Sequence, residues 1–234
     1  MKIFRIKIYL EFKEFISSIF NKDFKFKKID KILLNQSNKK FLTFTSQLRT
    51  GFLLILKFLK IKYKKKNEVI LMSYNLKEMI NIPSRLNLKI IFCDIDFKTG
   101  CLNIKELQKK ISKKTLCVVL TNIFSNYENC KKIRQICKRN KIPLIEDNAI
   151  YFDNFIQKDK KYFSGSFGDY SLFSFNIMKN ISGLYGGCIS YNNPEFKSFC
   201  LEIFKKNIKF PVTLYLRQII IFIFLKTFSL NFFL

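Results

Sequence analysis

The stretch from residue 142 to residue 187 combines residue types that could do chemistry together. An apolar run ends in two acids, Glu146 and Asp147. Farther along, Lys179 follows the segment Phe173–Met178, which carries no charge and contains a hydroxyl at Ser174. Taken alone, the two acids fit a solvated strand end or a helix cap as well as a catalytic role, and one lysine means little in a lysine-rich chain.

The order of these groups is more informative than any one of them. A glycine pair, Gly186-Gly187, follows the lysine, so the chain presents carboxylate, hydroxyl, amine and glycine pair in succession. Pyridoxal phosphate (PLP) requires an amine for a Schiff base and a carboxylate that keeps its ring nitrogen protonated. It also requires hydroxyl and backbone donors for its phosphate. A lysine in an apolar place has a lowered pKa, which leaves more free amine.

Apolar runs alternate with helical patterns from residue 41 onward. We expect strands at 68–74, 89–96, 115–122, 142–147, 169–175 and 187–191, and helices at 49–61, 76–85, 103–112 and 126–140. This alternation predicts an α/β fold with a mostly parallel sheet flanked by helices. Functional groups of such sheets gather at the carboxyl ends of the strands. The polar residues expected there are Tyr74, Asp96, Asn122, Asp147 and Ser174.

The composition excludes some classes of function. A net charge of +26 would ordinarily suggest nucleic acid or an anionic membrane as partner. However, 28 phenylalanines accompany the 43 lysines and arginines, and the lysines are scattered through the predicted helices. This favours a compositional background over a specific nucleic-acid partner. Histidine is absent and the seven cysteines include no C-x-x-C pair, so we expect reduced thiols and no metal site.

The two ends of the chain differ from its middle. We expect a basic helical lead-in at 1–40, a PLP-binding large domain at 41–200 and an apolar segment at 201–234. Charges mixed into the first twenty residues argue against a secretory signal, and the expectation of reduced thiols favours a cytoplasmic protein. The apolar runs 219–225 and 228–234 are short and are separated by Lys226. A truncated helix or an interface is therefore favoured over a membrane span.

Several segments, in order, resemble the large domain of the DegT/StrS-type aminotransferases, fold type I PLP enzymes that aminate keto-sugar nucleotides. They are Arg49-Thr-Gly-Phe-Leu with Asn67-Glu-Val-Ile70, Cys93-Asp-Ile-Asp96 with Thr99-Gly100 and Asn103-Ile104, Glu146-Asp147 with Ala149, and Phe173-Ser-Phe-Asn176 with Lys179-Asn180 and Gly186-Gly187. Each match is weak alone, but together they are collinear over about two thirds of the chain. The resemblance implies a fold type I large domain, with the small C-terminal domain largely missing.

The resemblance also implies a role for each matching residue. Lys179 is expected to form the Schiff base and to shuttle the substrate proton, and Asp147 to pair with the ring nitrogen. The other cofactor contacts that it implies are Ala149 and Tyr74 on the two ring faces, and Ser174, Thr50 and backbone N–H groups near Gly51 around the phosphate. An anion is favoured there because those N–H groups lie at a helix start.

Three positions depart from the family pattern. Ile150 stands where the family usually has a glutamine that contacts the cofactor, Tyr185 where a glutamate often precedes the glycine pair, and Arg49 where a small residue is common. The Asn-Tyr-Arg type segment of the family is not found in residues 200–234. These departures put substrate handling in doubt more than cofactor binding.

The leading hypothesis is a PLP-dependent aminotransferase that passes an amino group, from glutamate by family analogy, to a keto-sugar nucleotide in polysaccharide or glycoconjugate precursor biosynthesis. The family's dehydratases tend to replace the Schiff-base lysine, so Lys179 favours transamination. A homodimer is expected if the chain is active. One alternative is an inactive remnant that at most binds PLP, and another is a basic protein of membrane surfaces.

Overall fold

The computed structural model describes residues 10–20, 26–123, 126–150, 154–157, 160–179, 181–206 and 212–230. Its helices are α1 (Phe12–Phe20), α2 (Phe26–Ser37), α3 (Leu48–Lys62), α4 (Lys77–Arg85), α5 (Ile104–Lys110), α6 (Tyr127–Arg139), α7 (Pro194–Lys205) and α8 (Val212–Leu230). Its strands are β1 (Phe41–Thr45), β2 (Glu68–Met72), β3 (Lys89–Cys93), β4 (Thr115–Thr121), β5 (Leu144–Asn148), β6 (Asn154–Gln157), β7 (Lys160–Phe163), β8 (Tyr170–Ser174) and β9 (Gly187–Tyr191).

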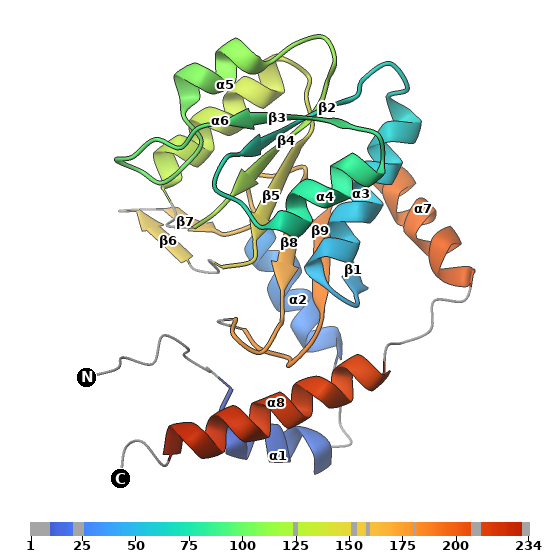
Figure 1. Cartoon of the computed structure of the whole chain (residues 1–234), viewed down its shortest axis with the longest axis vertical. Helices are drawn as coiled ribbons and strands as arrows, with labels where there is room; N and C mark the ends of the chain where they lie inside the picture. Colours follow the sequence, from blue (N-terminus) through green and yellow to red (C-terminus); the bar gives the residue numbers. More distant parts are fainter. Residues whose placement is uncertain are drawn as a thin grey trace.

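Seven strands form one sheet in the order β1-β9-β8-β5-β4-β2-β3 (Figure 1). β9 runs antiparallel to both of its neighbours, and the other pairings in this sheet are parallel. The α/β class with a mostly parallel sheet is therefore confirmed. The carboxyl ends of β4, β5 and β8 meet at one edge, where the sequence predicts the site.

Helices cover both faces of the sheet, which explains why β2, β4, β5 and β9 are buried at every residue and why β2 and β4 are apolar along most of their length. One hydrophobic core joins α3, α4 and α7 to the sheet, and a second joins α5 and α6 to the opposite face. At the end near β8 and β9, Leu33 of α2 packs against Phe173 and Cys188 on a third buried cluster. Buried apolar side chains thus support the end of β8, next to the expected site.

Three strands and one helix were not predicted from the sequence, namely β1, β6, β7 and α7. β1 is an edge strand of five residues that pairs with β9, a partner almost 150 positions later in the chain. β6 and β7 form a separate two-stranded hairpin. None of these three strands has a long apolar run, so they lack the signal that identifies the predicted strands.

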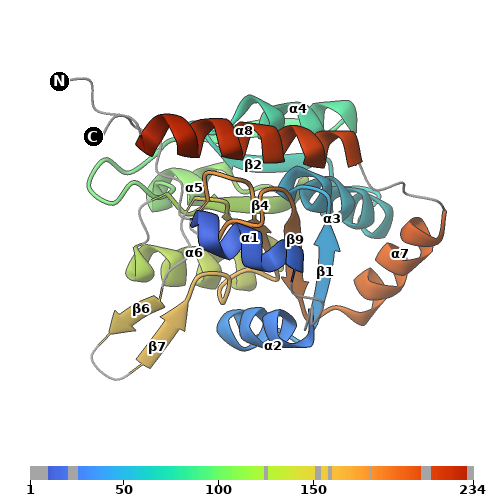
Figure 2. The same cartoon turned by 90° about the horizontal axis from the view of Figure 1, so that it is seen from below.

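α1 and α8 lie beyond the β8–β9 connection, apart from the main layers (Figure 1), and run side by side in both views (Figures 1 and 2). The rings of Phe15 and Phe222 are 4.9 Å apart, and both belong to a buried cluster that includes Ile177 and Leu184 of the connection. None of the helices in the described ranges is both long enough and apolar enough to span a membrane. The apolar C-terminal segment, predicted to be a truncated helix or an interface, is a helix that supports the connection between β8 and β9.

Candidate functional site

Lys179 lies in the connection between β8 and β9, and backbone hydrogen bonds fix this connection near Lys179 and where it leaves the sheet. Its backbone N–H donates to the carbonyl of Asn176 at 2.9 Å, and the N–H of Phe175 donates to the carbonyl of Gly186 at 2.9 Å. Ile177, two residues earlier, is buried against the α1–α8 pair. The side chain of Lys179 is half-buried. Loss of hydration lowers its pKa, although Asp147 acts in the opposite direction, and a lowered pKa suits an amine that must act as a nucleophile.

Asp147 lies near the carboxyl end of β5, next to Thr121 of β4 and Leu172 of β8 in the sheet register. Its side chain is only 3% exposed. Burial raises its pKa to about 6, against a lowering influence from the Ala149 N–H and from Lys179. The N–H of Ala149 donates to its Oδ1 at 3.0 Å, the one hydrogen bond that other described residues give this carboxylate.

A cavity of about 220 Å³ opens beside Lys179. It lies between the carboxyl edge of the sheet and the start of α3, and its walls come from four separate segments of the chain. The lining residues are Gln47, Leu48, Arg49, Leu76, Glu78, Met79, Ala149, Ser174, Asn176, Lys179, Tyr185 and Gly186. Lys179, Ser174 and Ala149 also line a narrower crevice that continues beneath the lysine. Three of the sequence-predicted residues are therefore brought to one place, with Asp147 buried behind them.

The start of α3 provides an anion site at the side of this cavity. No side chain caps the helix at Gln47, and the N–H groups of Leu48 and Arg49 have no acceptor among the described residues. The Ser174 hydroxyl, which also lines the cavity, makes no hydrogen bond to those residues either. Backbone N–H groups and the helix dipole favour a phosphate at such a helix start.

Two glycines bring the start of α3 close to the sheet. A Cβ on Gly187 would come within 2.5 Å of the backbone nitrogen of Leu48, and one on Gly51 within 2.8 Å of the side chain of Ile189. The N–H of Gly51 already donates to the carbonyl of Gln47 at 3.4 Å. Gly51 thus lets the helix approach the sheet, while the available donors lie two and three residues earlier.

Two other predicted contacts lie farther from the cavity. Tyr74 is 68% exposed and is not among the residues that line the cavity or the crevice. The hydroxyl of Thr50 is 3.1 Å from that of Ser46, on the first turn of α3, and Thr50 is also absent from the lining. Ile150, the departure from the family pattern, lines the crevice beside Lys179 and is 49% exposed.

Glu146, the neighbour of Asp147, has a structural position that the sequence analysis did not assign. It is fully buried and accepts hydrogen bonds from the N–H groups of Gly165, Phe167 and Gly168 at 2.8–2.9 Å and from the Asn122 side chain at 3.0 Å. Burial raises its pKa, and the backbone donors act against that increase. Because adjacent strand residues point to opposite faces, this carboxylate cannot share the cavity with Asp147.

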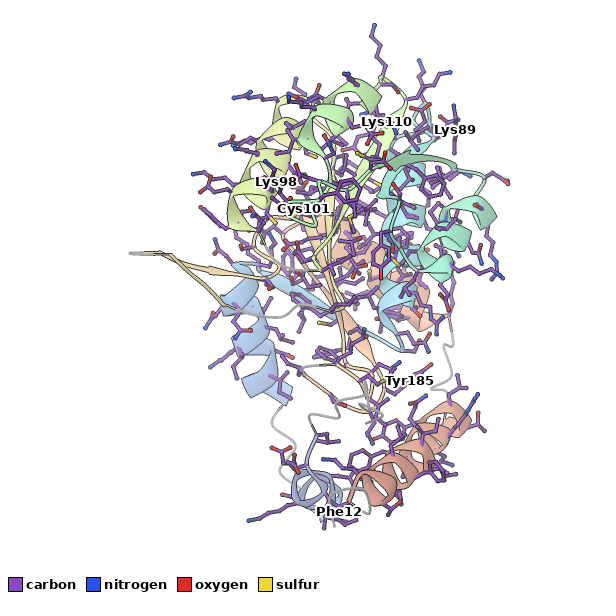
Figure 3. The ribbon with its side chains drawn as sticks, turned by 60° about the vertical axis from the view of Figure 1, so that its left-hand side comes forward. Phe12, Lys89, Lys98, Cys101, Lys110 and Tyr185 are labelled. Carbon is purple, nitrogen blue, oxygen red and sulfur yellow. The ribbon has the colours of Figure 1, made fainter. Side chains whose placement is uncertain are left out.

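Arg49 and Tyr185, two further departures from the family pattern, lie at the cavity. Arg49 forms an ion pair with Glu78 at 3.0 Å and donates from Nε to Gln47 at 2.5 Å, so its charge is partly compensated. Tyr185 lies at the end of the sheet that faces α8 (Figure 3). Both would touch a ligand in the cavity, and only comparison with the family pattern drew attention to them.

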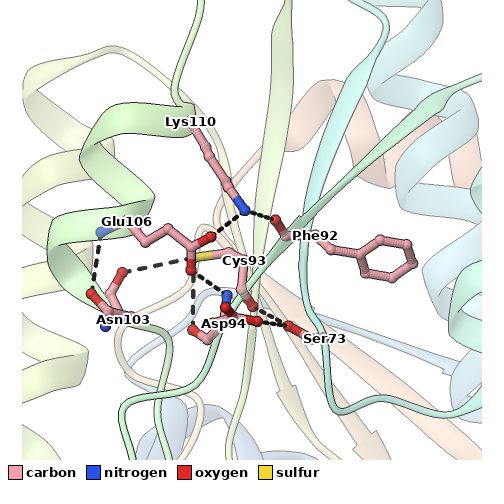
Figure 4. A network of polar contacts seen from close by, with 7 residues as sticks. All are labelled: Ser73, Phe92, Cys93, Asp94, Asn103, Glu106 and Lys110. Carbon is pink, nitrogen blue, oxygen red and sulfur yellow. Dashed lines mark hydrogen bonds and ion pairs between the residues drawn. The ribbon is translucent and has the colours of Figure 1, made fainter.

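A polar network around Glu106 holds the loop after β3 but has no part in the cavity (Figure 4). Glu106 accepts from the N–H of Asp94 at 2.5 Å and pairs with Lys110, while Asn103 caps the helix that carries it. Burial raises the pKa of the nearby Cys93 thiol to about 12, so this cysteine is not a nucleophile at neutral pH. Among the residues described, no cluster of acids and cysteines could hold a metal ion.

The residues at the cavity fit PLP. A buried carboxylate with one hydrogen bond suits a protonated ring nitrogen, a lysine with a lowered pKa suits a Schiff base, and the free donors at α3 and Ser174 suit a phosphate. Ala149 lines the cavity where an apolar surface could meet the ring.

The comparisons agree with this donor set. The DegT/DnrJ/EryC1/StrS aminotransferase family matches residues 26–210. GDP-perosamine synthase of Vibrio cholerae is 26% identical over 137 residues, which are 58% of this chain and 36% of that protein. An uncharacterized protein of Methanocaldococcus jannaschii is 29% identical over 168 residues, 72% of this chain and 42% of that one. The chain thus spans less than half the length of these relatives.

Solved structures show the same fold. GDP-4-keto-6-deoxy-D-mannose-3-dehydratase of Escherichia coli with bound hydrated PLP aligns at a TM-score of 0.66 and 23% identity, covering 81% of this chain and 49% of that one. The Helicobacter pylori aminotransferase of pseudoaminic acid biosynthesis aligns at a TM-score of 0.63 and 19% identity, covering 74% of this chain and 46% of that one. The match over residues 26–210 establishes that the chain belongs to the DegT/DnrJ/EryC1/StrS aminotransferase family.

Proposed function

We propose that this chain provides the PLP site of a sugar aminotransferase that passes an amino group from glutamate to a keto-sugar nucleotide. The observation that carries the proposal is the placement of a buried carboxylate, Asp147, near a half-buried lysine of lowered pKa, Lys179. Beside them is a cavity at which the Leu48 and Arg49 N–H groups have no acceptor among the described residues. The relatives support the substrate class, since they include GDP-perosamine synthases and a Bacillus subtilis 3-oxo-glucose-6-phosphate:glutamate aminotransferase.

PLP, when bound, supplies a ring that accepts electrons from the substrate carbon. Asp147 would accept a hydrogen bond from the protonated ring nitrogen and hold that proton there, which would keep the ring positive. The first-turn N–H groups of α3 and the Ser174 hydroxyl would bind the phosphate and fix the position of the ring. The Nζ of Lys179, when free, would take the proton from the substrate carbon and return it, and the loss of hydration that lowers its pKa favours the neutral amine that this role needs.

The alternative is a chain that binds PLP without turnover. It is favoured by Ile150, which places an apolar side chain at the crevice beside Lys179, and by the exposed position of Tyr74 away from the cavity. Both observations concern groups that would handle the ring and the substrate rather than anchor the cofactor.

A spectroscopic experiment tests both candidates. We expect PLP to give the purified chain a visible absorption band that borohydride reduction makes permanent, and that is absent in Lys179→Ala. Lys109→Ala, which removes an exposed lysine on α5, is the matched control and keeps the band. Glutamate then converts the band in an active transaminase, whereas a stable band that glutamate leaves unchanged supports binding without turnover. A folded chain with no lysine-dependent band contradicts both candidates.

A further inference from the structure

A second and larger cavity lies at the opposite edge of the sheet. Its volume is about 490 Å³, and it is bordered by Pro143 just before β5, Asp169 just before β8, Asn192 just after β9 and Tyr63 at the end of α3. These positions are the amino ends of parallel strands and the terminus of the antiparallel one, so the cavity is separated from Lys179 by the length of the sheet (Figure 1). Its size is within the usual range of small-molecule sites.

Basic side chains from several segments converge on this cavity. They come from the turn between α2 and β1, the last turn of α3, the last two turns of α6 and the turn that follows it, and they are Lys39, Lys62, Arg134, Lys138 and Lys141. Asp169 is the one acidic residue in the lining. Unlike the lysines scattered elsewhere, these five therefore form a compact concave group.

Only part of this charge is compensated within the protein. Asp169 accepts from Arg134 at 2.6 Å and from the N–H of Leu144 at 2.9 Å, and Lys62 pairs with Glu195. The described residues offer no hydrogen-bond acceptor or ion-pair partner to the side chains of Lys39, Lys138 and Lys141. Three cations thus share one hollow with a net positive field.

Lys39 is the most informative of the three. Its side chain is half-buried, unlike those of Lys138 and Lys141, which are exposed. Loss of hydration lowers its pKa, with the Arg134 charge acting in the same direction and Glu146 and Asp169 in the other. An ammonium group withdrawn from water without a hydrogen-bonded partner is unfavourable, and an anion in the cavity would remove that penalty.

Neutral donors and apolar walls complete the cavity. Asn192 accepts from the N–H of Lys40 at 2.8 Å through its side-chain oxygen, which leaves its amide N–H groups available. The Tyr170 hydroxyl lies 3.2 Å from the Asn193 amide that donates to it, so its own proton can be donated elsewhere. Leu59, Ile142 and Pro143 supply apolar surface. This mixture of a few polar groups on an apolar wall is typical of small-molecule sites.

We propose that this cavity binds a small ligand through a diphosphate group, either inorganic pyrophosphate or a nucleoside diphosphate. Three cations without a hydrogen-bonded or ion-paired partner among the described residues match the charge of a diphosphate better than that of a single carboxylate. The concave shape favours a small molecule over a nucleic acid duplex, which would need a continuous basic stripe on an open surface. The site goes beyond the proposed function because it involves none of the residues assigned to PLP.

Calorimetric titration of the whole PLP-saturated chain with inorganic pyrophosphate tests this site, since bound PLP blocks the anion site at α3. We expect saturable binding at one site per chain. Lys138→Gln/Lys141→Gln should weaken pyrophosphate binding by about tenfold or more, because the loss of each charged contact lowers the affinity for an anion several-fold. Lys39→Met, which retains most of the packing volume, should have a similar effect. The double variant alters only exposed positions and keeps the test valid if Lys39→Met fails to fold.

Lys105→Gln/Lys109→Gln is the control, because it removes the same charge from exposed positions on α5 outside the cavity. We expect it to change the affinity by less than about twofold. A parallel titration with GDP identifies the source: much tighter binding than pyrophosphate indicates a nucleoside diphosphate, and equal binding indicates the diphosphate group alone. Non-saturable binding, equal loss in both double variants, or displacement of pyrophosphate by duplex DNA would overturn the proposal. Failure here leaves the Lys179-dependent absorption band untouched.

Discussion

Two adjacent acids near the end of β5 have different environments because consecutive strand residues face opposite sides of the sheet. Asp147 faces the side of the Lys179 cavity with one hydrogen bond from Ala149, whereas Glu146 accepts four hydrogen bonds on the other side. The first arrangement leaves a carboxylate with capacity for another donor. The second arrangement leaves the carboxylate fully engaged in holding the loop before β8. The two neighbours therefore predict different consequences of mutation.

Asp147→Asn should impair catalysis while leaving cofactor binding largely intact. A neutral amide cannot hold the ring nitrogen in its protonated form, so the ring loses much of its capacity to accept electrons. We expect the rate of the glutamate half-reaction to fall by about 100-fold or more. Stopped-flow absorption measures this rate directly. An unchanged rate would show that Asp147 is not the partner of the ring nitrogen.

The same substitution should stabilise the PLP-free protein at neutral pH. The pKa of Asp147 is raised from 3.8 to about 6 in the folded state, so between these values the folded chain holds a proton that the unfolded chain releases. The free energy of unfolding therefore falls as pH rises through this window, and the cost of an ionised buried carboxylate persists above it. We expect Asp147→Asn to be more stable at pH 7 by about 1–3 kcal/mol, with a much smaller difference at pH 4. Urea denaturation at both pH values measures the difference, and a gap independent of pH would contradict the assignment.

Glu146→Gln should destabilise the protein without any direct effect on the cofactor. An amide has one acceptor oxygen where the carboxylate has two, and its NH₂ group would face the N–H groups of Gly165, Phe167 and Gly168. We expect a loss of about 2–4 kcal/mol in the free energy of unfolding. Glu78→Gln at the exposed ion pair with Arg49 is the control, and it should lose less than about 1 kcal/mol. Equal losses in the two variants would mean that the buried hydrogen bonds contribute little.

At the scale of elements, the contact between β9 and the start of α3 decides where the anion donors lie. Gly187→Ala would place a methyl group 2.5 Å from the Leu48 nitrogen, and backbone atoms cannot move aside cheaply. We expect the helix start to shift, with a loss of about 1–3 kcal/mol in stability and weaker binding of PLP. Gly183→Ala, in the connection that precedes β9, is the control, since the atom nearest to the added methyl group would be 3.6 Å away. Fluorescence titration with PLP compares the two, and similar affinities would rule out a role for this close approach.

The elements that the sequence predicts well are those with long apolar or amphipathic patterns. The predicted helix at 49–61 is observed at Leu48–Lys62, and the predicted strand at 187–191 is observed at the same residues. The strand expected at 142–147 begins two residues later, because Pro143 cannot donate to the neighbouring strand. β1 escaped prediction because its stability comes from pairing with a distant strand and from α2, neither of which is encoded in its own five residues.

The site could be predicted only where one strand end or one loop carries a residue to it. Asp147 and Ser174 follow from the rule that parallel strands present their groups at their carboxyl ends. Lys179 follows instead from its uncharged surroundings and from the order of the motifs around it. Gly51 was expected near the phosphate donors, but it serves the packing of α3 on the sheet, and the available N–H groups are those of Leu48 and Arg49. Both facts depend on how closely α3 approaches β9. The exposure of Tyr74 depends on the course of the loop after β2. Such distances between elements are set by tertiary packing and leave no pattern in a single sequence.

In the molecule as a whole, the connection between β8 and β9 that carries Lys179 lies between the sheet and the α1–α8 pair. Phe222 of α8 is fully buried against Phe15, and the same cluster contains Ile177 and Leu184 on either side of Lys179 in sequence. Segments near the two ends of the chain, α1 and α8, therefore pack against the β8–β9 connection, and Figure 1 shows both helices below it. The outward side of α8 remains apolar, with Ile220 67% exposed.

This arrangement predicts that a substitution on α8, far from Lys179 in sequence, makes the β8–β9 connection open more readily. Phe222→Ala removes the ring that fills the cluster and should lower the free energy of unfolding by about 2–4 kcal/mol. Because the cluster is separate from the main cores, we expect the loss to appear first as local opening of residues 175–186 rather than as global unfolding. Hydrogen exchange of that segment should therefore accelerate, while exchange in β4 and β5 stays slow. Ile220→Ala, at an exposed position on the same helix, is the matched control and should leave the segment protected. If Phe222→Ala left exchange at 175–186 unchanged, the connection would be held by the sheet alone, and the α1–α8 pair would have no part in positioning Lys179.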